Sequence, residues 1–414
     1  MKPTNAAIRV ASFTVISIAI TFFIQGILTR WLDVAEYGDI TVALTLCSLL
    51  GTVITLGLND FYLKLASEKN GCTKELRLRI LKIHSLAFLV VFSIASIILH
   101  YCEMLNLTMF LGVAYSHGAF LFLNAVLQVN GNYNTLSFVQ LIQPALRLIF
   151  LFGIFVVWEA SVTSVASAYL IVSIIVLIIS YSVFYSAKSS KVTVNSNRQL
   201  LKDSIPFSFA ILLHLIYFQS DLLLLRIYMG PETVAYYNIA FLIVSSVYIL
   251  PGIYYQKIML PKLHRWFSSE GESDIKAFEQ LRLKTLLIGI ACSIAVVFGA
   301  YIFIPLVFGK DYSNSLVLVY CLAIAIPIRF LSCNYGALLM VKDNINIKVK
   351  CMGLTAILNI ILNFAIVPMY GAIGAAVSTV ISELALCFLY RKYSSDFMKF
   401  AFKIKKEVSS ESVL

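Results

Sequence analysis

Polar and charged side chains interrupt several long apolar stretches of this chain, and these are the residues whose chemistry matters most. Within 139–158, Gln140, Gln143 and Arg147 follow the spacing i, i+3 and i+7, which places them on one face of a helix. A guanidinium is permanently charged and can donate two parallel hydrogen bonds to phosphate oxygens. The pattern therefore predicts a polar cavity with a deep cation, which suits an anionic ligand.

A second polar face lies in the preceding apolar stretch, 107–129, where His117, Asn124 and Gln128 recur at helical spacing. Such residues either line a hydrated cavity or hydrogen-bond between packed helices, and both readings stay open. Arg329 comes shortly after Pro327, where a proline-loosened turn can admit water, so it is a further candidate for the cavity.

Four ionisable residues are candidates for coupling transport to an ion gradient: Asp221, His214, Asp60 and Glu383. Asp221 and His214 are seven residues apart, on one face of a helix, and a carboxylate with an imidazole can take up H+ or Na+. A static polar contact is the alternative. Asp60 and Glu383 also offer an alternative for Arg147, because an ion pair with either would make that arginine a packing residue.

Enzyme signatures are missing from the sequence, which contains no GxxxxGK[ST], HExxH, HxxxxD or GxSxG motif. The eight cysteines form no CxxC pair and no metal-like spacing, so they are expected to be small apolar packing residues. We therefore expect no enzyme, no metal and no cofactor. Without a nucleotide site, work must come from a gradient, which indicates a secondary carrier.

The elements that must position these residues are membrane-spanning helices. Hydrophobic residues make up 60% of the 414 and charged residues only 13%, and apolar runs of about 20 residues are long enough to cross a bilayer. Hydropathy predicts an all-α integral membrane protein with twelve spans, at 8–29, 40–63, 83–102, 107–129, 139–158, 162–186, 204–228, 233–256, 285–308, 314–341, 351–368 and 371–390.

The basic residues are distributed very unevenly between the two sides of these spans. With a cytoplasmic N-terminus, 27 of the 32 Lys and Arg residues fall on the inner side, and only Arg30, Arg226 and Lys310 fall outside. This positive-inside bias places both termini in the cytoplasm. It also explains the net charge of +11 without nucleic acid.

The chain divides into two halves of six helices. The predicted organisation is an N-terminal lobe at 1–186, a cytoplasmic linker at 187–203, a C-terminal lobe at 204–391 and a basic cytoplasmic tail at 392–414. Tyr37-Gly38-Asp39-Ile40 and Tyr236-Tyr237-Asn238-Ile239 each follow a short outer loop and lie 199 residues apart. The halves are thus expected to be pseudo-symmetric repeats.

Three passages resemble the polysaccharide transporters of the multidrug/oligosaccharidyl-lipid/polysaccharide (MOP) superfamily, in particular the O-antigen flippases. They are RWLDVAEYGDITVALTLCSLLGTVITLGL from Arg30, DLLLLRIYMGPETVAYYNIAFLI from Asp221, and LNIILNFAIVPMYGAIGAAVSTVISE from Leu358. The resemblance implies two lobes around a central cavity, as in the related MATE transporters. Arg147 matches no motif of the family, and its assignment depends on its position alone.

The family resemblance implies a flippase of the bacterial inner membrane. Its cargo would be an undecaprenyl-pyrophosphate-linked oligosaccharide, such as an O-antigen repeat unit of lipopolysaccharide biosynthesis, moved from the cytoplasmic to the periplasmic leaflet by alternating access. A polysaccharide polymerase and a chain-length regulator are further expected partners. One alternative is a multidrug or cation antiporter of the same superfamily. Another is a membrane polysaccharide polymerase, which would need a large periplasmic loop that the predicted topology lacks.

Overall fold

The computed structural model describes residues 3–68, 73–101, 105–186, 196–259, 263, 273–340 and 345–411, and every secondary-structure element in these ranges is helical. The chain separates into two compact units, Met1–Ile216 and Tyr217–Leu414. We refer to them as the first and the second unit.

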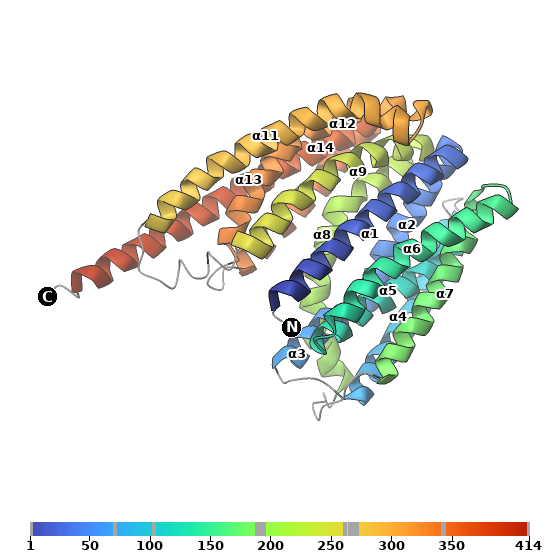
Figure 1. Cartoon of the computed structure of the whole chain (residues 1–414), viewed down its shortest axis with the longest axis horizontal. Coiled ribbons are helices and arrows are strands. Elements are labelled where there is room, and N and C mark those ends of the chain that lie inside the picture. Colours follow the sequence, from blue (N-terminus) through green and yellow to red (C-terminus); the bar gives the residue numbers. More distant parts are fainter. Residues whose placement is uncertain are drawn as a thin grey trace. The chain divides into compact units, whose positions relative to one another are not determined.

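The first unit contains the helices of the N-terminal half. They are α1 (Pro3–Trp31), α2 (Val34–Thr55), α3 (Leu58–Glu68), α4 (Lys74–Tyr101), η1 (Leu105–Phe110), α5 (Leu111–Val129), α6 (Tyr133–Val157), α7 (Val162–Ser186) and the first part of α8 (Asn197–Met229). Helix α1 packs along α6, and α5 contacts α2, α3 and α7 (Figure 1). Helix α5 also contacts α6, so the polar faces predicted on these two helices belong to neighbours.

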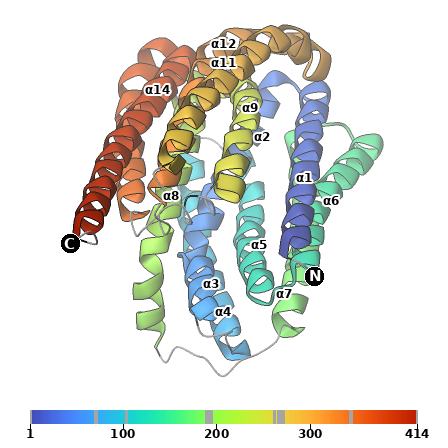
Figure 2. The same cartoon turned by 60° about the vertical axis from the view of Figure 1, so that its left-hand side comes forward.

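The second unit continues α8 and adds the C-terminal helices. These are α9 (Pro231–Ile253), the π-helical η2 (Tyr254–Met259), α11 (Ser273–Val307), η3 (Lys310–Asn314), α12 (Ser315–Ala323), α13 (Ala325–Leu338) and α14 (Ile345–Glu411). Helix α13 packs against α9, α11 and α14. Helix α12 packs against α11 (Figure 2).

The described residues hold nine single helices that are long and apolar enough to span a membrane, and two bent helix pairs that pass the same test. One of the nine is the 50-residue stretch Asn346–Ser395, which is far too long for one crossing and is kinked at Gly371, where φ is 55°. Counted as two, it brings these candidate spans to the predicted twelve. The helices are those expected of an all-α membrane protein.

One predicted span is wrong at its end. The span predicted at 40–63 stops at Thr55, because Leu56 and Gly57 adopt left-handed backbone conformations with φ of 49° and 70°. A Cβ on Gly57 would clash with the carbonyl oxygen of Ser204, so only glycine fits this turn. Asp60 consequently lies in the first turn of α3, outside the candidate spans.

The predicted domain limits fall partly on residues that the structure does not describe. Of the predicted linker, 187–195 lie outside the described residues and 197–203 form the start of α8. The two compact units meet within α8, after Ile216. The side chains of the tail from residue 396 onward are also outside the described set.

Candidate functional site

Arg147 is a half-buried cation inside the first unit. Its guanidinium carbon lies 4.8 Å from the ring centroid of Tyr169 on α7, in a cation–π arrangement. Cys47 of α2 and His117 of α5 lie within its electrostatic range. Among the described residues, none forms an ion pair or a hydrogen bond with Arg147, so the predicted alternative of a pair with Asp60 is not observed.

A proline sits one turn before Arg147, and α1 compensates for it. Pro144 has no N–H, so the carbonyl oxygen of Gln140, four residues earlier, loses its helical donor. The Ser17 hydroxyl of α1 donates to this oxygen at 3.0 Å, and Thr14 donates to the Gln140 side chain at 3.4 Å. Gln140 therefore joins α1 to α6.

The three predicted polar residues of α5 have different surroundings. His117 packs against α2 at Gly51, where an added Cβ would lie 2.9 Å from the His117 ring. Asn124 is half-buried and its Oδ1 has no hydrogen-bond partner within the described part of the chain. Gln128 is exposed, and Gln143 on α6 is half-buried. The cavity-lining role of these residues stays a prediction.

Asp221 is 2% exposed in the second unit and is surrounded by neutral donors from α9 and α14. Its Oδ2 accepts hydrogen bonds from the hydroxyl of Tyr237 on α9, at 2.6 Å, and from the hydroxyl of Thr379 on α14, at 2.7 Å. Its Oδ1 accepts one from Asn363 Nδ2, which also donates to Asn359 Oδ1 at 3.1 Å. No described cation pairs with this carboxylate.

The two hydroxyls at Asp221 are also close to each other, since 3.1 Å separates the Tyr237 and Thr379 oxygens. Three oxygens thus form a triangle with three short edges. An ionised Asp221 leaves only two protons for these edges, one from each hydroxyl. A proton on Oδ2 fills the third edge, and a small cation bound by the oxygens would be the other way to relieve their repulsion.

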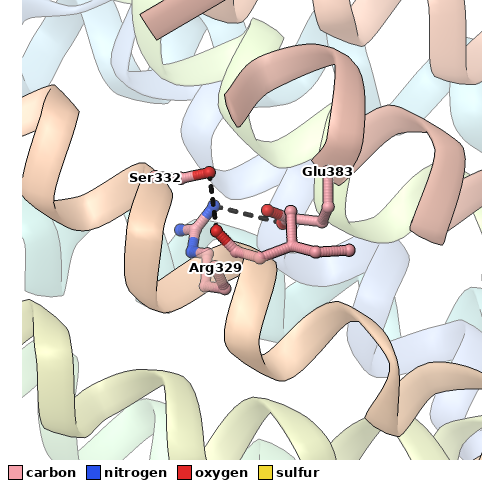
Figure 3. Close-up of polar contacts among 4 residues, drawn as sticks. Arg329, Ser332 and Glu383 are labelled. Atoms are coloured by element: carbon pink, nitrogen blue, oxygen red, sulfur yellow. Dashed lines mark hydrogen bonds and ion pairs between the residues drawn. The ribbon is translucent and has the colours of Figure 1, made fainter. Parts of the chain in front are cut away.

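Arg329 and Glu383, predicted for separate roles, form an ion pair in the second unit. Arg329 Nη1 lies 3.2 Å from Glu383 Oε1, and the Arg329 side chain is 20% exposed while that of Glu383 is 1% exposed. Figure 3 shows the guanidinium on α13 directed at the carboxylate on α14, with Ser332 beside them. Because Arg329 neutralises Glu383, this acid is also not the partner of Arg147.

The helix that carries Arg329 is broken just before it. A bend of 41° separates α12 from α13, and Pro327 removes the donor to the carbonyl oxygen of Ala323. The Ser293 hydroxyl of α11 donates to that oxygen at 2.8 Å. Gly289, one turn earlier on α11, leaves space for the proline, because a Cβ there would lie 2.8 Å from Pro327 Cα. Serine and proline thus form the same arrangement near both arginines.

The remaining candidates and three residues missed from the sequence complete the comparison. Asp60 is half-buried with its Oδ2 lacking a partner among the described residues, and the side chain of His214 is outside the described set. Tyr237 and Thr379 were missed, although Tyr237 lies in the repeated four-residue motif. Arg77, which belongs to the basic residues counted on the inner side, is 1% exposed and donates to the Phe184 carbonyl at 3.2 Å.

The sequence matches a protein family over most of its length. The model of the polysaccharide biosynthesis protein family matches residues 6–262. The chain belongs to this family. A capsular polysaccharide biosynthesis protein of Staphylococcus aureus, CapF, is 26% identical over 156 residues, which cover 36% of this chain and 38% of that protein. The match thus spans well under half of the curated relative.

Solved structures show which fold this family member adopts. The lipid II flippase MurJ in an inward closed conformation aligns with a TM-score of 0.72 and 16% identity, over 95% of this chain and 90% of that one. An outward-facing multidrug resistance MATE transporter of the MOP superfamily aligns with a TM-score of 0.61 and 14% identity, over 97% of both chains. At such low identities the likeness concerns the fold, which is that of MOP-superfamily transporters.

Proposed function

We propose that the protein is a flippase for an undecaprenyl-pyrophosphate-linked oligosaccharide, such as an O-antigen or similar repeat unit. It would carry this cargo from the cytoplasmic to the periplasmic leaflet by alternating access. Unaided crossing is opposed by the cost of stripping water from a charged pyrophosphate and many hydroxyls. Membership of the polysaccharide biosynthesis family supports this class of cargo.

The observation that carries the proposal is that no described residue supplies a counter-charge for Arg147. A cation inside a membrane protein normally pairs with an acid or marks a ligand pathway. No described carboxylate pairs with Arg147, and the aromatic ring of Tyr169 supports the guanidinium from one side. An anionic headgroup would supply the missing counter-charge, and the guanidinium geometry matches its phosphate oxygens.

The test is surface polysaccharide in cells that depend on this protein. Arg147→Ala should abolish it at a normal protein level, and Arg147→Lys should be intermediate, because an ammonium keeps the charge and loses the bidentate geometry. Arg282→Ala, at an exposed position, is the matched control and should retain polysaccharide. Normal polysaccharide in the Arg147→Ala cells would reduce this arginine to a packing residue.

Transport in vesicles separates the proposal from its main competitor. Purified protein should move lipid-linked sugar between leaflets and leave organic dye cations unmoved. A multidrug or cation antiporter would export the dye and ignore the lipid. That second outcome would end the flippase proposal and leave the fold assignment intact.

Asp221 and its neutral donors are our candidate for coupling to a gradient of H+ or Na+. A buried carboxylate without a described cation is costly in a membrane, and the triangle with Tyr237 and Thr379 lacks one proton when Asp221 is ionised. In the first unit, the hydroxyl of Tyr37 instead donates to the neutral Gln25 at 2.8 Å. Ion uptake is therefore assigned to the second unit.

Asp221→Asn tests this assignment directly. The amide keeps the shape and removes the charge, so lipid flipping in vesicles should lose its response to an imposed gradient. Running the assay with a proton gradient and then with a sodium gradient identifies the ion. If the variant and the wild type respond equally to both gradients, Asp221 is a structural contact.

Placement in the inner membrane with both termini in the cytoplasm belongs to the same proposal. Reporter fusions at Lys191 and Lys262 should report the cytoplasm, and a fusion at Arg30 the periplasm. An outward signal at either lysine would overturn the topology. A polysaccharide polymerase and a chain-length regulator are the partners that such a flippase would serve.

A further inference from the structure

The two membrane arginines differ in their electrical surroundings. Arg147 has no described counter-charge, whereas Arg329 forms an ion pair with Glu383 and lies over two aromatic rings. Its guanidinium carbon is 5.1 Å from the Phe218 ring centroid and 5.6 Å from that of Tyr248. The Arg329–Glu383 pair itself therefore carries no net charge, with Lys348 within electrostatic range of Arg329, and the cluster is rich in aromatic surface.

Several polar atoms of this cluster are buried and unbonded. They are Arg329 Nε, Glu383 Oε2 and the hydroxyl oxygens of Tyr217 and Tyr248, none of which has a hydrogen-bond partner among the described residues. Both tyrosines are 8% exposed. Both lie within electrostatic range of Glu383 and Arg329, and the Tyr217 hydroxyl lies beside the Glu383 carboxylate. Such atoms are expected to have a partner.

The kinds of unbonded atom restrict what that partner can be. Arg329 Nε only donates, Glu383 Oε2 only accepts, and each tyrosine hydroxyl does both. A phosphate would meet the negative Glu383, and an ammonium group would meet the positive Arg329. A sugar hydroxyl both donates and accepts, and the apolar face of a sugar ring can lie on an aromatic ring. The 20% exposure of the Arg329 side chain leaves an approach from that side.

We propose that Tyr217, Tyr248, Arg329 and Glu383 form a saccharide-binding site that recognises hydroxyl groups of the cargo. The inference rests on the proposed function, and it assigns recognition of the sugar to residues of the second unit. It also separates Arg329 from the set of anion-binding candidates. The site discriminates between sugars, because a hydroxyl missing from the cargo leaves buried groups unpaired.

The experiment compares two probes on the full-length protein in lipid nanodiscs. One probe is undecaprenyl pyrophosphate without sugar, and the other is undecaprenyl-pyrophosphate-linked N-acetylglucosamine. The wild type should bind the sugar-bearing probe more tightly. Tyr248→Phe and Tyr217→Phe, which each remove one oxygen, should each weaken that probe about fivefold to tenfold, as one lost hydrogen bond predicts. Both should leave the bare carrier unchanged.

The controls make each outcome decisive. Tyr301→Phe, on the 69% exposed Tyr301 of α11, should change neither affinity. Arg147→Ala should weaken both probes equally, because both carry the pyrophosphate. If the tyrosine variants affect both probes alike or neither, or if the wild type does not prefer the sugar, the saccharide site is refuted. If the wild type binds neither probe, the proposed function itself fails.

Discussion

Replacing Ser293 by alanine tests whether a side chain of α11 repairs the break before Arg329. The Ser293 hydroxyl is the donor to the Ala323 carbonyl, whose own helical donor is removed by Pro327. A buried carbonyl without a donor costs about 1–3 kcal/mol, whereas hydrogen bonds between membrane helices average about 0.6 kcal/mol. We therefore expect Ser293→Ala to lower the free energy of unfolding by about 1 kcal/mol.

A double-mutant cycle isolates this bond from other effects. In Pro327→Ala, residue 327 regains an N–H that can donate to Ala323, so the same Ser293→Ala change should then cost close to nothing. The expected coupling energy is about 1 kcal/mol, within the range measured for residues in contact. Steric trapping of the full-length protein in lipid bicelles measures the free energy of unfolding of all four variants.

Ser180→Ala serves as the matched control for the cycle. Ser180 is fully buried in α7 and its hydroxyl donates to the Val176 carbonyl of its own helix at 2.7 Å, which also receives the helical N–H. Removing this hydroxyl leaves no carbonyl without a donor. Ser180→Ala should therefore lower the free energy of unfolding by only a few tenths of a kcal/mol, which is about the lower limit for a hydrogen bond. An equal cost of Ser293→Ala in the presence and absence of Pro327 would refute the reasoning.

Two further predictions concern the first unit. Ser17→Ala should reduce surface polysaccharide severalfold by leaving the Gln140 carbonyl, about two turns before Arg147, without a donor, and Pro144→Ala in the same chain should restore it; no restoration would remove the proline from the explanation. Gly51→Val should lower the free energy of unfolding by about 1–3 kcal/mol, because its Cβ would lie 2.8 Å from the Ala114 carbonyl oxygen. Gly153→Val is the control and should leave it unchanged, because a Cβ at Gly153 has nothing within 4 Å. Equal melting temperatures of the two valine variants would contradict the second prediction.

Hydropathy identified the spans because apolar length is a direct requirement of the bilayer, but it could not place every helix end. Leu56, Gly57 and Leu58 continue an apolar run, and glycine is common inside membrane helices. The turn there depends on a close approach to the backbone of α8, far away in the sequence. The composition of this segment does not indicate that contact.

The sequence predicted single residues of the candidate sites better than it predicted which residues lie together. Asp221 was singled out as an ionisable residue in an apolar segment, while Tyr237 and Thr379 were missed because tyrosine and threonine are ordinary in membrane helices. Arg329 and Glu383 are 54 residues apart, and only folding brings them together. The sequence therefore indicates which side chains are costly to bury, and the structure shows which of them interact with one another.

The serine and proline near each arginine restrict the order in which the sequence can change. Losing Pro327 first leaves the Ala323 carbonyl with a helical donor, after which Ser293 is free to vary. Losing Ser293 first leaves the Ala323 carbonyl without a donor, because the proline is still present. Natural variants should therefore include chains with the serine and without the proline, and rarely the reverse. The same asymmetric epistasis is expected between Ser17 and Pro144.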